Sequence, residues 1–221
     1  SEGAPLRRPV DYAEIELRRA ELARAAQVPA PPFWGARVIE RIDPRAILPY
    51  LNESMLFQFQ WGFRKAGKSR EEFREWAKRE VRPILRRIAE ISAKENILQP
   101  KAVYGYWKAA ADGDDLVLFE ESGQGEVARF HLPRQKREGG LCIADFFRDI
   151  RSNERDVCGL QIVTVGDRPS EVARAWFAED RYQDYLYLHG FSVEMAEALA
   201  EYVHKTIRAE LGIGGDDAPE T

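Results

Sequence analysis

The chain has 221 residues, of which 44% are hydrophobic and 32% charged, a composition typical of a folded protein that can bury a core. The formal net charge is −4 and the lysines and arginines are spread along the chain, which excludes the basic face that a nucleic-acid-binding protein needs. No stretch approaches about 18 continuous apolar residues, which excludes a predicted membrane span.

Both ends of the chain have the composition of segments outside a folded domain. Residues 1–29 are polar with helical character, and a cluster of prolines then breaks that pattern, as in an interdomain linker. Residues 213–221 follow glycine stop signals and form an acidic tail. We therefore expect a linker over 1–29, a folded domain over 30–212 and a tail over 213–221, as in a piece of a longer polypeptide.

The first part of the expected domain is predicted to be helical. Asp43 and Pro44 fit the N-cap and first position of a helix, which the apolar spacing extends to about Gly62. Ser69 begins a capping-box pattern that opens a second, longer helix. Pro83 lies inside this second pattern, so we expect a kink or an outright break there.

The middle of the chain changes to the period of strands. Residues 102–107, 115–120 and 126–132 have strand character, and the turn-rich "DGDD" and "SGQG" join them, which predicts two successive hairpins. A short helix is expected at "LCIADFFRDI". Residues 158–166 then have the pattern of a buried strand.

Two helices are predicted after this strand. Pro169 opens the first, which Gly190 stops, and Ser192 caps the second, which continues to about Leu211. The order of helices, then strands, then helices with one strand between them predicts an α+β fold. We expect an antiparallel sheet of hairpins flanked by long helices in a single domain.

The last predicted helix has a narrow apolar stripe bordered by a polar one, which contains Glu197, Glu201 and His204. One interpretation is a solvated rim with pairs such as Glu201 with Lys205 and His204 with Arg208. The other is a groove, in which a carboxylate held on a rigid helix accepts hydrogen bonds from a cationic or hydroxylated ligand. The pattern alone leaves both interpretations open.

Other chemistry-bearing residues form no recognisable site in the sequence. The histidines, His131, His189 and His204, lack metal-site spacing, and no serine lies in a nucleophile-elbow pattern. The hairpin glycines precede no helix start, so they predict turns rather than phosphate cradles. The basic segment 133–138 is expected to be an exposed loop, either solvated or touching an acidic partner. The two cysteines lie outside any CxxC or Cys/His cluster, which favours a reducing cytoplasm.

Several stretches form one ordered pattern when they are taken together. In chain order they are "PPFWGARVIERI", "YLNESMLFQFQWGFRK", "LQPKAVYGYWKA…GDDLVLF", "RFHLPRQ", "LCIADFF", "GLQIVTVG" and "YLYLHGFSVEMAEALAEYVHKTIRAELG". In this order and spacing they resemble the reactivation domain of cobalamin-dependent methionine synthases, the C-terminal module of those enzymes. The resemblance covers roughly residues 30–212.

The resemblance implies a function. Enzymes of this family move a methyl group from methyltetrahydrofolate to homocysteine through cobalamin, and zinc serves the full enzyme only. The reactivation domain binds S-adenosylmethionine, docks on the cobalamin-binding domain of the same polypeptide, and supports reductive methylation of inert cob(II)alamin with an electron from a flavodoxin-type reductase. The implied protein is a cytoplasmic, monomeric methyltransferase domain, with no catalytic residue, metal site, nucleic acid or membrane of its own. The alternative is a non-catalytic docking module that caps the cobalamin domain and binds flavodoxin without ligand.

The resemblance also implies two ligand-binding residues. Glu197 occupies the place of a ligand-contacting carboxylate on the late helix. Asn52 occupies the place of a second carboxylate, and its amide oxygen can meet an ammonium group without charge assistance. The family's R-x-x-x-G-Y-x-x-C-P segment, which holds most of the ligand, does not occur before Thr221. We therefore expect a truncated domain, and weak or no ligand binding by the isolated fragment.

Overall fold

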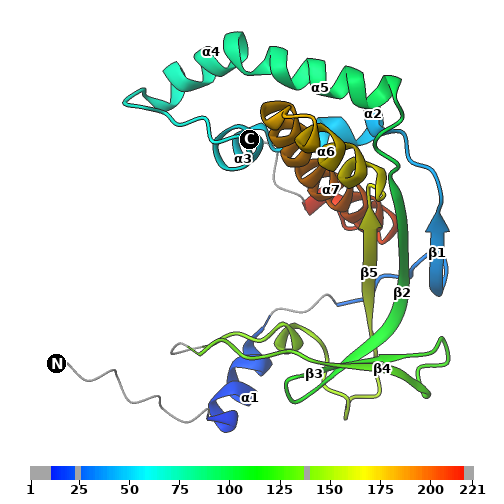
Figure 1. The fold of residues 1–221 in the computed structure, drawn as a ribbon. Helices are drawn as coiled ribbons and strands as arrows, with labels where there is room; N and C mark the ends of the chain where they lie inside the picture. The colour runs from blue at the N-terminus through cyan, green and yellow to red at the C-terminus, as the bar shows by residue number, and fades with distance from the viewer. Residues whose placement is uncertain (1–10, 23–25, 137–139, 217–221) are drawn as a thin grey trace. The chain divides into compact units, whose positions relative to one another are not determined.

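The structure is a computed structural model that describes residues 11–22, 26–136 and 140–216, and Figure 1 labels its elements. The α-helices are α1 (Tyr12–Glu21), α2 (Pro44–Ile47), α3 (Glu53–Met55), α4 (Arg70–Glu80), α5 (Arg82–Lys94), α6 (Arg168–Ala178) and α7 (Tyr182–Glu210). Shorter helical turns are η1 (Leu48–Tyr50), η2 (Leu56–Gln60), η3 (Ile143–Phe146) and η4 (Gly214–Asp216), of which η2 is π-helical. The strands are β1 (Gly35–Ile39), β2 (Lys101–Asp112), β3 (Asp115–Phe119), β4 (Glu126–His131) and β5 (Asp156–Thr164).

The strands form one five-stranded sheet with the order β1-β2-β3-β4, and β5 also pairs with β2. The β2–β3 and β3–β4 pairs are antiparallel, with Val117 opposite both Ala110 and Arg129. Both hairpins predicted from "DGDD" and "SGQG" are therefore confirmed, as is the α+β class. Strand β1 was not predicted, because "GARVI" lacks the two-residue alternation of apolar side chains that marks a half-buried strand.

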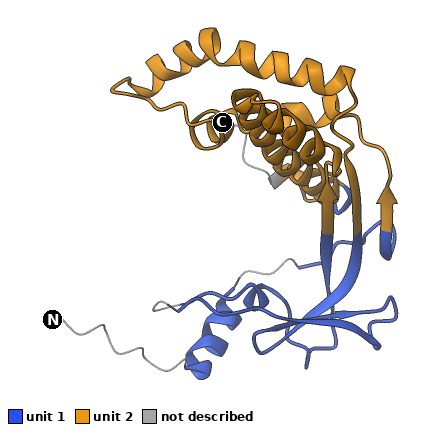
Figure 2. Cartoon of the chain, in the orientation of Figure 1, with its two compact units in different colours: residues 1–36, 105–160, 210–212 blue, residues 37–104, 161–209, 213–221 orange. Residues whose placement is uncertain are grey.

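Contacts divide the chain into two units, coloured separately in Figure 2. Unit 1 comprises residues 1–36, 105–160 and 210–212, and unit 2 comprises the remainder, as far as the structure describes them. Strands β1, β2 and β5 each contribute residues to both units. The units are thus interleaved in sequence, which agrees with the prediction of one domain rather than two domains in succession.

In unit 1, the sheet requires a glycine where two strands approach. A Cβ atom on Gly105 of β2 would collide with the carbonyl oxygen of Gly35 and lie 2.8 Å from the Cα of Ala36 in β1. The next residue, Tyr106, is fully buried. Its ring contacts Phe33 edge-on at 5.1 Å, and its hydroxyl group lies 2.6 Å from a carboxylate oxygen of Glu210. A side chain at position 105 would therefore separate β1 from β2.

The helical signals around α4 and α5 are confirmed. The hydroxyl oxygen of Ser69 accepts from the backbone N–H of Glu72 at 3.2 Å, and the Glu72 carboxylate accepts from the backbone N–H of Ser69 at 2.7 Å. Val81 separates the two helices, and Pro83 lies in the first turn of α5. Of the two expected outcomes at this proline, the break is the one that occurs, since proline is tolerated in a first turn but not inside a helix.

The stretch from Asp43 to Gly62 is not the single helix that was predicted. The side chain of Asp43 caps α2 as expected, accepting from the backbone N–H of Arg45 at 2.9 Å. Pro49 then removes a hydrogen-bond donor from the helical ladder, and the chain becomes extended at Leu51, with φ −65° and ψ 124°. Helix α3 starts anew after this extended residue. The apolar spacing alone did not reveal this interruption.

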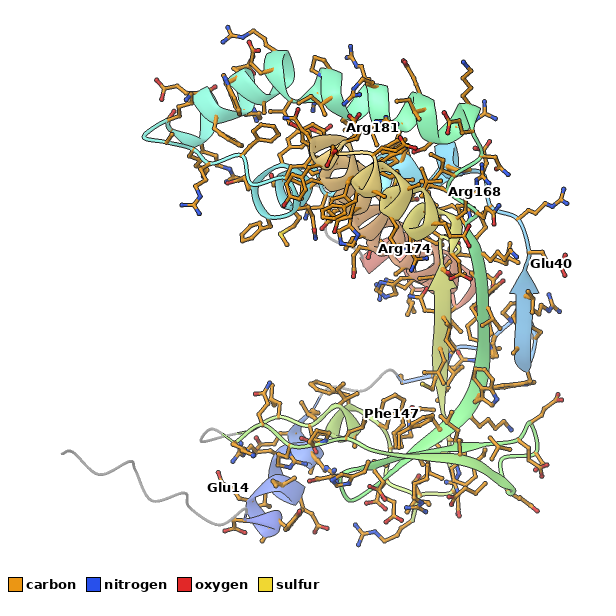
Figure 3. All side chains as sticks on the ribbon, in the orientation of Figure 1. Glu14, Glu40, Phe147, Arg168, Arg174 and Arg181 are labelled. Atoms are coloured by element: carbon orange, nitrogen blue, oxygen red, sulfur yellow. The ribbon has the colours of Figure 1, made fainter. Side chains whose placement is uncertain are left out.

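The helices at the C-terminal side also differ from the prediction. Helix α6 ends at Ala178, and Asp180 reverses the chain in the left-handed region with φ 59°. In this turn Arg181, labelled in Figure 3, lies over the ring of Trp176 at 4.4 Å and pairs with Asp184 at 3.0 Å. Helix α7 then runs unbroken from Tyr182 to Glu210. The predictions that Gly190 stops a helix and that Ser192 caps the next one are therefore wrong.

Candidate functional site

Neither Gly190 nor Ser192 marks an end of α7: Gly190 lets another element pack closely, and Ser192 bonds within the helix. A Cβ atom on Gly190 would lie 2.8 Å from the Cβ of Gln60 and 2.9 Å from Cδ1 of Trp61, so only glycine lets η2 approach the helix this closely. The hydroxyl group of Ser192 donates to the carbonyl oxygen of Leu188 at 2.7 Å, one turn back in the same helix. A mid-helix glycine costs about 1 kcal/mol relative to alanine, which this close approach offsets.

The segment 50–61 packs along α7 at both of its ends, within unit 2. At one end the rings of Tyr50 and Tyr202 meet edge-on at 5.7 Å. At the other end the indole N–H of Trp61 donates to the carbonyl oxygen of Tyr187 at 3.1 Å. These contacts hold the segment from Tyr50, the last residue of η1, to Trp61, just after η2, against one side of the rigid helix.

A buried carboxylate lies between these two anchor points. Glu194 on α7 is only 4% exposed, and its Oε1 accepts a hydrogen bond from Nε2 of Gln60 at 3.0 Å. At about 100° per residue, Glu194 shares a stripe of the helix with Gly190 and Glu197. Sequence reasoning missed Glu194, and its place on this stripe was the one signal that could have found it.

Glu197 is exposed on α7, three residues beyond Glu194. Among the residues that the structure describes, none pairs with its carboxylate. Nearby on the rim, Nδ1 of His204 lies 3.6 Å from Oε2 of Glu201, and the ammonium group of Lys205 lies 4.9 Å from the ring centre of Tyr50. The carboxylate of Glu197 is therefore accessible to a ligand, and its role in binding remains a prediction.

Asn52 is exposed and is the N-cap of α3. Its Oδ1 accepts from the backbone N–H of Met55 at 3.1 Å. An amide oxygen has two lone pairs, so one of them stays available to accept a hydrogen bond from a ligand. The amide nitrogen also offers two N–H groups as donors. The structure places Asn52 on the segment packed against α7 and Glu197 on that helix, but no hydrogen bond joins these two described side chains.

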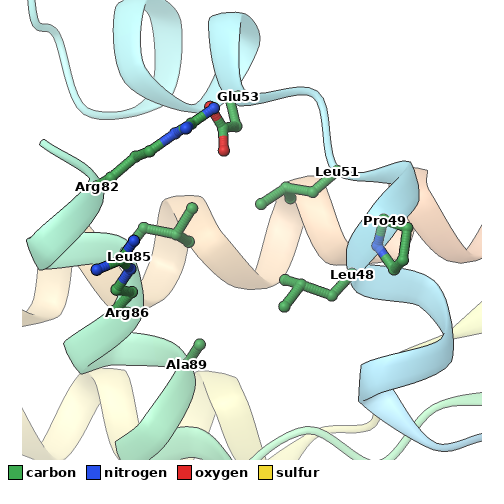
Figure 4. Close-up of a pocket in the computed structure, with 8 residues that line it drawn as sticks. All are labelled: Leu48, Pro49, Leu51, Glu53, Arg82, Leu85, Arg86 and Ala89. Atoms are coloured by element: carbon green, nitrogen blue, oxygen red, sulfur yellow. The ribbon is translucent and has the colours of Figure 1, made fainter. Parts of the chain in front are cut away.

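A hollow of about 420 Å³ lies beside this segment in unit 2 (Figure 4). Neither Asn52 nor Glu197 lines it. This cavity is called here the α5 hollow. It is lined by Leu48, Pro49, Leu51, Glu53, Arg82, Leu85, Arg86 and Ala89. Both nitrogens of the Arg82 guanidinium group that face Glu53 donate to the same carboxylate oxygen, at 2.9 and 2.8 Å.

Unit 1 contains a buried charged cluster, called here the Arg134 cluster, formed by Arg19, Asp114, Arg134 and Asp145. Arg134 donates to Asp145 at 2.6 Å and to Asp114 at 2.7 Å, and Arg19 donates to Asp145 at 2.7 Å. All four side chains are at most 14% exposed. The expectation of an exposed basic loop over 133–138 is wrong at Arg134, because this guanidinium group is needed to neutralise two buried carboxylates.

The pKa of Asp145 reflects two opposing effects. Burial alone would raise this pKa, but hydrogen bonds from Arg134 and Arg19 and from the backbone N–H of Cys142 lower it to about 2. The carboxyl group therefore stays ionised across the physiological range. Since its charge is already neutralised by two arginines, the cluster has no charge left to offer a ligand, and it serves to hold α1 to the unit.

Over residues 11–22, 26–136 and 140–216, no group of three or more His, Cys, Asp or Glu side chains is arranged to hold a metal ion. Within the same ranges, no helix combines the length and the apolar character needed to cross a membrane.

Comparison with known proteins gives a consistent set of relatives. The sequence profile of the vitamin B12 dependent methionine synthase activation domain matches residues 45–218. The methionine synthase of Mycobacterium tuberculosis is 39% identical over 208 residues, which cover 90% of this chain and 17% of that protein. The methionine synthase of Mycobacterium leprae is 37% identical over 198 residues, covering 86% of this chain and 16% of that protein. The chain thus spans about a sixth of the length of these relatives.

A solved structure shares the fold. The MetH reactivation domain bound to AdoHcy superposes with a TM-score of 0.75 at 22% sequence identity, covering 92% of this chain and 66% of that chain. This likeness confirms the α+β architecture predicted from the sequence. Since the profile match spans most of the chain, and the predicted resemblance rests on the same region, the chain belongs to the family of vitamin B12-dependent methionine synthase activation domains.

Proposed function

We propose that this chain serves as the reactivation domain of a vitamin B12-dependent methionine synthase and supports the reductive methylation of cob(II)alamin, with S-adenosylmethionine as the methyl donor. The observation that carries the proposal is the profile match over residues 45–218. The fold likeness to a reactivation domain bound to AdoHcy supports it further. AdoHcy is the compound left when S-adenosylmethionine has given up its methyl group, so a domain that holds one has a site suited to the other.

The proposed site residues are Asn52 and Glu197. S-adenosylmethionine carries a sulfonium and an ammonium group as well as ribose hydroxyl groups, and all of these except the sulfonium centre donate hydrogen bonds. The exposed carboxylate of Glu197, with no described residue paired to it, can accept such bonds with charge assistance. The amide oxygen of Asn52 can accept one with its remaining lone pair. The rigid α7 and the segment packed on it would fix both acceptors before the ligand arrives, which lowers the entropy cost of binding.

Cobalamin would supply the cobalt that accepts the methyl group, held by a separate domain of the same polypeptide. In the proposal, the residues of this chain bind and orient the methyl donor and keep water from the reacting atoms. A flavodoxin-type reductase is the proposed electron source, and zinc belongs to another part of the full enzyme. The proposed compartment is the cytoplasm, which suits two cysteines that are both buried free thiols.

Titration calorimetry with S-adenosylmethionine and with AdoHcy tests the proposal. We expect weak binding by the chain, with a dissociation constant of about 1 mM, and Glu197→Gln is expected to weaken it about tenfold through loss of a charge-assisted hydrogen bond. Glu201→Gln is the matched control, since Glu201 is exposed on the same helix one turn further on, and it should leave the affinity unchanged. Absence of any binding heat, with retained binding to the cobalamin domain, would favour the alternative of a docking module without ligand.

A further inference from the structure

The α5 hollow is a second concave site in unit 2, separate from the residues proposed to bind the methyl donor. Its volume of about 420 Å³ falls within the range of small-molecule sites. Most of its wall is apolar, from Leu48, Pro49 and Leu51 on one side and Leu85 and Ala89 on the other. Figure 4 shows Leu48 and Leu51 on one side of the opening facing Leu85 and Ala89 on the other.

The backbone explains why this space is left open. Pro49 ends the helical ladder and the chain becomes extended at Leu51, so the segment between η1 and α3 departs from a helical path beside α5. On the facing helix, Ala89 offers only a methyl group. Leu48 remains 37% exposed although it points to other leucines, because no described side chain fills the opening.

The charges around the hollow do not balance. The carboxylate of Glu53 is neutralised by Arg82 through two hydrogen bonds. Arg86, one turn further along α5, has no hydrogen bond or ion pair to any residue within the described ranges. Two arginines and one glutamate therefore leave a single uncompensated positive charge on the lining. A guanidinium group presents paired donors that match the two oxygens of a carboxylate.

We propose that the α5 hollow binds a small organic monocarboxylate with a branched or linear apolar body. The carboxylate would pair with the guanidinium group of Arg86, and the hydrocarbon body would lie against Leu51 and Leu85. A single net positive charge complements a monoanion, whereas a phosphate ester would bring more negative charge than this lining neutralises. The apolar wall supplies most of the affinity, and the ion pair with Arg86 adds to it and orients the acid.

Ligand-observed NMR titration of the chain with isocaproate tests this site. We expect saturable binding with a dissociation constant of about 1 mM, the affinity reached by small ligands with few polar contacts. Isocaproamide, which has the same shape without the charge, should bind at least about tenfold more weakly. Arg86→Gln should weaken isocaproate to the same extent, while Lys94→Gln, an exposed charge removed from the same helix, should have no effect.

A second variant tests the cavity itself. Ala89→Leu keeps a good helix former on α5 and fills the hollow, so it should abolish isocaproate binding while leaving the circular dichroism spectrum unchanged. The proposal is overturned if isocaproate shows no saturation up to about ten times the expected dissociation constant. It is also overturned if the amide binds as well as the acid, or if Arg86→Gln or Ala89→Leu binds like the parent chain. Binding of S-adenosylmethionine does not enter this test, so the two proposals can fail separately.

Discussion

The Arg134 cluster in unit 1 and the polar rim of α7 in unit 2 use charge in opposite ways. In the cluster, two arginines and two aspartates neutralise one another at 2.6–2.7 Å with at most 14% exposure. On the rim, Glu197 is exposed and unpaired among the described residues. Buried charges that neutralise one another have no net charge left for a ligand, whereas an exposed acceptor on a rigid helix keeps its charge. Charge thus holds structure in the Arg134 cluster, whereas the carboxylate of Glu197 on the rim is left accessible.

The largest effect is expected where the cluster is broken. Arg134→Met should lower the free energy of unfolding by about 3–5 kcal/mol, because Asp114 and Asp145 would keep buried charges without their shared partner. Urea unfolding followed by circular dichroism measures this change. Lys136→Met, an exposed residue of the same segment, is the control and should change stability by less than about 0.5 kcal/mol. Equal effects of the two variants would contradict the structural role of the cluster.

A smaller effect is expected in unit 2, where η2 packs against α7. Gly190→Ala should destabilise the protein by about 1–2 kcal/mol, because overpacking against Gln60 and Trp61 costs more than the gain in helix propensity. The same unfolding assay measures it. Gly215→Ala adds a methyl group in open space and is the matched control. A Gly190→Ala protein as stable as the parent would mean that η2 moves away from the helix at little cost.

The sequence predicted those parts of the fold that local chemistry determines. The capping box at Ser69, the cap at Asp43 and the two hairpin turns were all confirmed, because each depends on residues a few positions apart. The helix ends inferred at Gly190 and Ser192 were wrong, because there a tertiary contact with η2 decides the role of the glycine. A helix-stop signal and a close-packing site use the same residue, and only the partner element distinguishes them.

The candidate site was less predictable than the fold. The periodicity of the last helix placed Glu197 at an exposed edge, which the structure agrees with. Periodicity could not reveal that Glu194 is buried against Gln60. It also could not reveal that the side chain of Arg134, in a basic segment, is buried in an ion-pair cluster. Each of these depends on residues that lie more than ten positions apart in the chain. Long-range pairing of polar groups therefore sets the limit of what patterning can show here.

The smallest effect is expected at Asn52, whose side-chain amide lies at the proposed methyl-donor site. Asn52→Asp should tighten S-adenosylmethionine binding by about three- to tenfold in the full-length protein, because a charge-assisted hydrogen bond is roughly twice as strong as a neutral one. Aspartate is as good an N-cap as asparagine, so the start of α3 at Glu53 should be kept and unfolding should be unchanged. Ser54→Asp adds the same charge two residues after the cap and controls for general attraction of a cationic ligand. Calorimetry decides between them: an Asn52→Asp protein that binds no more tightly than Ser54→Asp would remove Asn52 from the ligand and leave its side chain only the role of a helix cap.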